Sequence, residues 1–163
     1  MARRTRGDGG TPATVALTTA GVAFTARSYA HDPAAASYGL EAAEALGVEP
    51  ARVFKTLLVE TDGTLAVGIV PVDRQLDLKA LAASLGVKRV QMADPAAAER
   101  ATGYVVGGIS PVGQKRRLAT VLDESASAYG TVLVSGGRRG LDIELSPADL
   151  LAVTGATLAP ISR

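Results

Sequence analysis

The chain has 163 residues, a formal net charge of +1 and no cysteine. Its length suits one compact domain, and the lack of cysteine excludes disulfides, thiolate nucleophiles and the common zinc-finger spacings. No apolar run approaches the ~20 residues of a membrane span, and no apolar segment follows the basic N-terminus. We therefore expect a soluble, cytoplasmic protein.

Residues 1–10 are basic and rich in glycine, which predicts a flexible tail ahead of a folded domain over residues 11–163. The first helix is expected to begin at Thr11 and Pro12, because these residue types suit the N-cap and the first helical turn. Gly21 is expected to end it.

A strand over residues 23–29 is expected next, followed by a helix between Ser37 and Gly47. Two apolar strands, 53–60 and 65–70, come after it. The Asp-Gly dipeptide between them is typical of a tight hairpin turn. We expect this pair of strands to form the centre of the sheet.

Asp77 and Asp94 are each expected to cap a short helix, the first of which ends at Gly86. The later part of the chain mainly predicts strands, over residues 104–106, 120–122, 131–135 and 141–144. Ser146 and Asp149 have the spacing of a capping box for a C-terminal helix. Because the strands do not alternate regularly with long helices, the pattern predicts a single α+β domain with a mixed sheet.

Several common chemistries are excluded by the residues available. His31 is the single histidine, so a histidine-based zinc site or a catalytic triad would have to use that one residue. Residues 108–115 imitate the spacing of a phosphate-binding P-loop, but Gln precedes the Lys and no helix signal follows. Ser110 precedes a proline and so lacks the setting of a nucleophile elbow. We expect no metal and no cofactor.

Lys55 lies inside an apolar strand, where a charged amine is costly unless it has a partner. Two glycine-rich loops, 107–111 and 136–140, are each expected at a strand end. Glycine lets backbone N–H groups converge on an anion or an oxyanion, although the same loops also suit ordinary tight turns. Together these features predict a ligand-binding domain, and an enzyme, for a small anionic or carbonyl-bearing ligand.

Six segments carry a resemblance that covers nearly the whole chain after residue 11. They are residues 29–33 (YAHDP), 53–59 (VFKTLLV), 75–79 (QLDLK), 92–95 (MADP), 102–111 (TGYVVGGISP) and 135–144 (SGGRRGLDIE). In this order they resemble the YbaK/EbsC family of bacterial Cys-tRNA(Pro) deacylases, which is similar to the editing domain of bacterial prolyl-tRNA synthetases. The resemblance implies a mixed, barrel-like central β-sheet flanked by short helices.

The resemblance also implies a translation-fidelity enzyme that hydrolyses the ester of mischarged Cys-tRNA(Pro) in trans. Lys55 occupies the position of the family's key lysine, and the loop at Gly107 and Gly108 would offer backbone donors to the substrate carbonyl. The other matching residues would bind the aminoacyl group: Tyr29, Tyr38, Thr56, Ile109, Ser110, Pro111, Ser135 and Asp142.

A chain with no cysteine and no clear general base would gain from a nucleophile carried by the substrate, and the family is thought to use the cysteinyl thiol. A cationic neighbour raises the thiolate fraction of such a thiol. Its attack on the adjacent carbonyl would release tRNA and a thiolactone. Lys55 would then either anchor the terminal phosphate or stabilise the oxyanion, and the sequence leaves both roles open.

Two other functions stay open: a deacylase for another mischarged tRNA such as Ala-tRNA(Pro), and a module that binds tRNA or the synthetase without chemistry. The expected partners are the acceptor end of an aminoacyl-tRNA and, in trans, prolyl-tRNA synthetase. The basic clusters at 88–89, 115–117 and 138–139 suit contact with a phosphate backbone, although each alone also suits a solvated surface patch. No membrane is expected as a partner.

Overall fold

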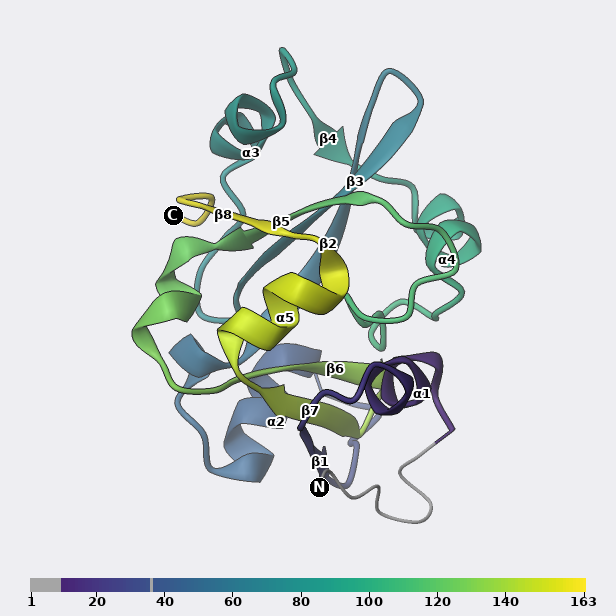
Figure 1. Cartoon of the computed structure of the whole chain (residues 1–163), viewed down its shortest axis with the longest axis vertical. Coiled ribbons are helices and arrows are strands. Elements are labelled where there is room, and N and C mark those ends of the chain that lie inside the picture. The colour runs from purple at the N-terminus through teal and green to yellow at the C-terminus, as the bar shows by residue number, and fades with distance from the viewer. Residues whose placement is uncertain (1–9, 36) are drawn as a thin grey trace.

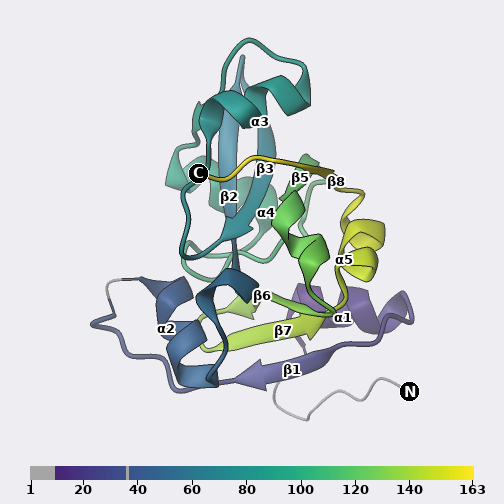
Figure 2. The ribbon, with the colours of Figure 1, turned by 90° about the vertical axis from the view of Figure 1, so that its left-hand side faces the viewer.

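The computed structural model describes residues 10–35 and 37–163, so the predicted tail lies outside this part of the chain except for Gly10. The strands form two sheets, which lie one above the other in Figures 1 and 2. The small sheet comprises β1 (Thr25–Ser28), β6 (Val132–Arg138) and β7 (Leu141–Leu145). The large sheet comprises β2 (Phe54–Thr61), β3 (Thr64–Pro71), β4 (Gln91–Met92), β5 (Ala119–Asp123) and β8 (Thr157–Ala159).

β2 and β3 form the predicted hairpin. Asp62 and Gly63 have φ angles of 49° and 77°, in the left-handed region that a two-residue type I′ turn requires. The antiparallel pairing runs from Thr61 opposite Thr64 to the far ends of both strands. The strand order β4-β2-β3-β5-β8 places β3 in the middle, and its parallel pairing with β5 makes the large sheet mixed. The predicted central position of the hairpin is thereby confirmed.

Five α-helices flank the sheets in the described part of the chain: α1 (Pro12–Thr19), α2 (Tyr38–Leu46), α3 (Leu78–Leu85), α4 (Pro95–Thr102) and α5 (Pro147–Thr154). Each begins after a side chain that accepts a backbone N–H: Thr11, Ser37, Asp77, Asp94 and Ser146. These are the caps that the sequence predicted. Two short 3₁₀ helices complete the elements, η1 (Pro50–Arg52) and η2 (Glu124–Ala128).

The elements confirm a single α+β domain with short flanking helices. Its strands divide between two sheets, and an isolated parallel bridge between Val53 and Leu133 joins β2 to β6. The small sheet, β1-β7-β6, is antiparallel throughout. The sequence pattern did not predict β4 and β8, which have two and three residues, because such short edge strands have too few positions to show a period.

The strand predicted over residues 104–106 is wrong, because this segment is a loop. Tyr104 turns its ring into the core and donates its hydroxyl to Val112 O at 2.6 Å. Val106 N donates to the Glu99 carboxylate at 2.8 Å instead of to a neighbouring strand. Local hydrogen bonds therefore satisfy a backbone whose aromatic and branched residues had suggested β structure.

The packing of Val53 sets β2 against the small sheet. This side chain lies in one buried cluster with Ala43 of α2 and Leu133 of β6, whereas Phe54 and Leu58 lie in the main core on the other face of the strand. The start of β2 is thus held between α2 and β6, below the rest of the hairpin (Figure 2). None of the described helices is long and apolar enough to cross a membrane.

Candidate functional site

A cavity of about 370 Å³ opens where β2, α2, the small sheet and the loop after α4 meet. This volume falls in the ordinary range for small-molecule sites. Eight of the residues singled out from the sequence line it: Tyr29, Tyr38, Lys55, Thr56, Gly107, Ile109, Ser135 and Asp142. They come from segments far apart in the chain, which only the tertiary structure brings together.

Three of the residues named from the sequence are not part of the cavity lining: Gly108, Ser110 and Pro111. Ser110 is fully buried, and its hydroxyl accepts from Val112 N at 3.2 Å. Gly108 N donates to Val105 O at 2.8 Å, so this N–H is used within the loop and is not directed at a substrate carbonyl. These residues shape the loop that carries Gly107 and Ile109.

Lys55 is half-buried in the cavity wall. Burial lowers the pKa of its ammonium, and the charge of Asp73 partly offsets this effect. Lys55 forms no salt bridge with any residue that the structure describes. Lys55 therefore lines the cavity without a bonded carboxylate among the described residues.

Thr56 is a second polar residue of the cavity lining, on β2 next to Lys55. Its side-chain oxygen is buried and makes no hydrogen bond among the described residues. Alternate residues of a strand direct their main-chain N–H and C=O groups to the same side. The carbonyl of Leu58 accepts from Ala93 N at 3.0 Å, so the main-chain groups of Thr56 point to this same side of β2. β4 pairs on this side only with residues 59–60, so the edge of β2 at Thr56 is left without a neighbouring strand.

Asp142 lies on β7 directly opposite Ser135 of β6 and Arg27 of β1. Its side chain is 6% exposed. Burial raises the pKa of this carboxyl to about 7, although the charge of Arg27 works in the opposite direction. Burial raises the pKa of the Tyr29 hydroxyl, and the charge of Asp142 raises it further.

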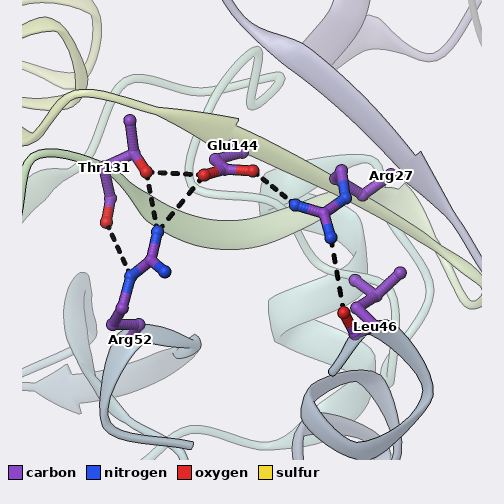
Figure 3. Close-up of polar contacts among 5 residues, drawn as sticks. All are labelled: Arg27, Leu46, Arg52, Thr131 and Glu144. Carbon is purple, nitrogen blue, oxygen red and sulfur yellow. Dashed lines mark hydrogen bonds and ion pairs between the residues drawn. The ribbon is translucent and has the colours of Figure 1, made fainter. Parts of the chain in front are cut away.

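Glu144, on the same face of β7 as Asp142, forms salt bridges with two arginines (Figure 3). Arg27 binds one of its carboxylate oxygens at 2.5 Å and Arg52 of η1 binds the other at 3.2 Å. Thr131 donates its hydroxyl to Glu144 at 2.6 Å and accepts from Arg52 at 2.7 Å. These bonds lower the pKa of Glu144 and tie η1, three residues before Lys55, to the small sheet.

Three lining residues, Tyr38, Val106 and Gly107, lie at a contact between the loop after α4 and the β6-β7 hairpin. The Arg139 guanidinium lies 4.3 Å from the centre of the Tyr38 ring and donates to Val106 O at 2.7 Å. Gly107 lies against this guanidinium and has a φ of 94°. Behind Tyr38, His31 binds the Glu41 carboxylate at 2.9 Å, so the single histidine is engaged outside the cavity lining.

Sequence reasoning missed the apolar part of the cavity wall. It includes Phe54, Leu58, Met92, Ala93, Pro95, Ala98 and Val106. The segment 92–95 had entered the resemblance as a motif, but an apolar lining residue has the same pattern as a core residue, so no local signal distinguishes them. No group of three side chains suited to holding a metal occurs in the described part of the chain.

The sequence of the chain is similar to those of known proteins. The family model of the aminoacyl-tRNA editing domain matches residues 32–153. Over 121 residues the chain is 42% identical to EbsC of Enterococcus faecalis, named as a candidate Cys-tRNA(Pro)/Cys-tRNA(Cys) deacylase, and the match covers 74% of each protein. Over 68 residues it is 43% identical to the proline–tRNA ligase of Moorella thermoacetica, covering 42% of this chain and 12% of the ligase.

Solved structures agree with these matches. The crystal structure of a candidate trans-editing enzyme for prolyl-tRNA synthetase has a TM-score of 0.80 to this chain at 28% sequence identity. The match covers 93% of this chain and 95% of that one, so the two share their fold over almost their whole length.

Proposed function

Because the chain belongs to the aminoacyl-tRNA editing domain family, whose reaction is hydrolysis of an aminoacyl ester, we propose that it deacylates Cys-tRNA(Pro). The observation that carries the proposal is the position of Lys55 in the wall of a cavity of about 370 Å³. This half-buried cation has no salt-bridge partner among the residues that the structure describes. A cavity of this size admits an aminoacyl group and its ribose but not a folded RNA, so it is suited to the acceptor end of a tRNA.

The proposed nucleophile is the thiol of the cysteinyl group. The sulfur loses its proton, attacks the carbonyl carbon of the same residue, and forms a C–S bond. The ester C–O bond then breaks, the ribose oxygen takes up a proton, and a thiolactone leaves for later hydrolysis by water. Lys55 supplies positive charge that favours both the thiolate and the developing oxyanion. The tRNA is released intact.

We further propose that the domain acts in trans beside prolyl-tRNA synthetase, in the cytoplasm where its aminoacyl-tRNA substrate is made. Two similarities support the pairing: part of the proline–tRNA ligase of Moorella thermoacetica is similar in sequence, and a candidate trans-editing enzyme for that synthetase is similar in fold. The domain is proposed to extend over residues 11–163, with residues 1–10 as a separate tail.

The test is release of labelled amino acid from Cys-, Ser-, Ala- and Pro-tRNA(Pro) by the wild type and by Lys55→Met, with Lys79→Met on the exposed surface of α3 as the matched control. We expect selective cleavage of Cys-tRNA(Pro), a loss of ~10²–10³ in kcat for Lys55→Met, and no change for Lys79→Met. Cleavage of Ala- or Ser-tRNA as fast as Cys-tRNA would overturn thiol assistance. Inactivity on all four with retained tRNA binding would overturn the enzymatic proposal.

The division of the Lys55→Met effect between kcat and KM separates the two roles of the lysine. A loss confined to kcat indicates charge stabilisation in the transition state. A rise in KM with a weaker dependence on salt indicates that Lys55 binds a phosphate instead.

A further inference from the structure

Asp142 is a buried carboxyl for which the described part of the protein provides no hydrogen-bond or salt-bridge partner. Its side chain is 6% exposed and lines the cavity. Buried carboxylates are almost always paired, because removing an isolated charge from water costs several kcal/mol. An unpaired carboxyl in the wall of a binding cavity therefore indicates a ligand that brings the missing cation.

Arg27, whose charge acts on the pKa of Asp142, does not fill this role because its guanidinium is bonded elsewhere. Arg27 lies opposite Asp142 in the β1-β7 pairing, but its guanidinium binds Glu144 at 2.5 Å and the carbonyl of Leu46 at 3.4 Å (Figure 3). Glu144 thus binds Arg27, while Asp142, on the same face of β7, lines the cavity.

The cavity has two ends of opposite character. Asp142 and Ser135 lie on the small sheet and Tyr29 directly follows β1, whereas Lys55 and Thr56 lie on β2. The charge of Asp73 acts on the pKa of Lys55. Arg138, at the end of β6, is a further charged residue of the cavity lining. A ligand that spans the cavity would place a cation at the small sheet and an electron-rich group at β2.

We propose that Asp142 binds the α-ammonium group of the aminoacyl ester, so that the enzyme accepts esters with a free α-amino group and rejects N-acylated ones. This inference rests on the proposed function and adds the chemical group by which the site selects its substrate. With the ammonium at Asp142, the ester carbonyl, two bonds away, extends from the small sheet toward Lys55. An ammonium offers three donors and a full charge, whereas an N-acyl amide offers one donor, no charge and added bulk.

The experiment compares kcat/KM for Cys-tRNA(Pro) and N-acetyl-Cys-tRNA(Pro) at pH 7 in the wild type, in Asp142→Asn and in the control Asp62→Asn, which lies in the exposed hairpin turn. Because a hydrogen-bonded charge pair contributes more than a neutral one, we expect the wild type and the control to prefer the free amine by roughly 10- to 100-fold. Asp142→Asn should lose most of this preference by losing activity on the free amine. Equal cleavage of both substrates by the wild type overturns the inference.

A binding measurement keeps the two proposals distinguishable. Calorimetry with 3′-cysteinylamino-3′-deoxyadenosine, whose amide resists hydrolysis, and with its N-acetyl form reports recognition whether or not the protein is active. Tighter binding of the free amine by the wild type, lost in Asp142→Asn, supports the inference even if no ester is cleaved. Equal affinity for both compounds overturns it, while cleavage of Cys-tRNA(Pro) in the first assay would leave the proposed function standing.

Discussion

Thr56 and Asp142 are single residues whose buried polar atoms lower the stability of the fold. In the described part of the chain, the buried Thr56 hydroxyl oxygen has no hydrogen bond, and the buried Asp142 carboxyl has no salt bridge. Such groups remain in a stable fold only when the rest of the structure offsets their cost. Both residues line the same cavity, which indicates that ligand binding, rather than folding, accounts for them.

Replacing Thr56 with Val should therefore stabilise the protein and weaken its activity. The substitution keeps the shape of the side chain and removes the unpaired hydroxyl, whose desolvation destabilises the fold by ~1–3 kcal/mol. Tm should therefore rise by about 2–4 °C for each kcal/mol gained. Thermal unfolding and deacylation are measured on the same samples, with Thr64→Val at the exposed start of β3 as the control. A lower Tm would show that the hydroxyl has a partner in solution.

Among the elements, the loop after α4 and the β6-β7 hairpin form a contact that depends on the absence of a side chain at Gly107. A Cβ at this position would overlap the Arg139 guanidinium and approach the Tyr38 ring to 2.9 Å. The left-handed φ of 94° is a second reason for glycine here. The loop is thus held by a cation on an aromatic ring and one hydrogen bond from Arg139.

Gly107→Ala should cost both stability and activity, whereas Gly86→Ala should cost stability alone. Both glycines have positive φ, and a Cβ at Gly86 would meet nothing within 4 Å, so backbone strain of ~1–2 kcal/mol is common to the two variants. Displacement of Arg139 and Tyr38 from the cavity mouth adds to Gly107→Ala alone, for which we expect at least a tenfold loss of kcat/KM. Equal activity of the two variants would mean that this contact does not shape the cavity.

At the scale of the whole molecule, the cavity exists because two sheets are held at a defined separation. The bridge from Val53 to Leu133 and the bonds of Arg52 to Thr131 and Glu144 fasten the start of β2 to the small sheet. In this arrangement the pKa values of Asp142 and Glu144, two residues apart on β7, shift in opposite directions. The pKa of Asp142 is raised by burial, and the pKa of Glu144 is lowered chiefly by its hydrogen bond from Thr131.

The stability of the molecule should depend on pH through Asp142 in a definite direction. Its pKa is about 7 in the folded state against an ordinary value of 3.8, so the folded state holds the proton more tightly. The resulting stability is complete below about pH 4 and is lost as pH rises through 7, by at most about 1.4 kcal/mol for each pKa unit. Glu144 acts at lower pH and in the opposite sense, since its lowered pKa makes stability fall as the solution is acidified.

Chemical unfolding of the wild type and of Asp142→Asn between pH 5 and pH 8 measures this effect. The free energy of unfolding of the wild type should fall relative to that of the variant as pH rises across this range. Parallel curves for the two proteins would show that Asp142 is not desolvated in solution.

The amino-acid sequence by itself determined the local structure of this protein. The five helix caps, the hairpin turn at Asp62 and Gly63 and the α+β class followed from it, because caps and turns depend on bonds between residues two to four positions apart. The family resemblance added the residues of the site, but it did not distinguish Gly107, in the cavity wall, from Gly108, whose N–H is used inside the loop.

Only the tertiary structure decided how the strands divide into two sheets, why residues 104–106 form a loop, and which charges are paired. The bonds between Arg27 and Glu144 cross 117 positions of the chain, and they leave Asp142 without a partner among the described residues. Such pairings depend on distance in space and on burial, which no local pattern encodes. The charge pattern of the cavity is therefore a property of the folded molecule.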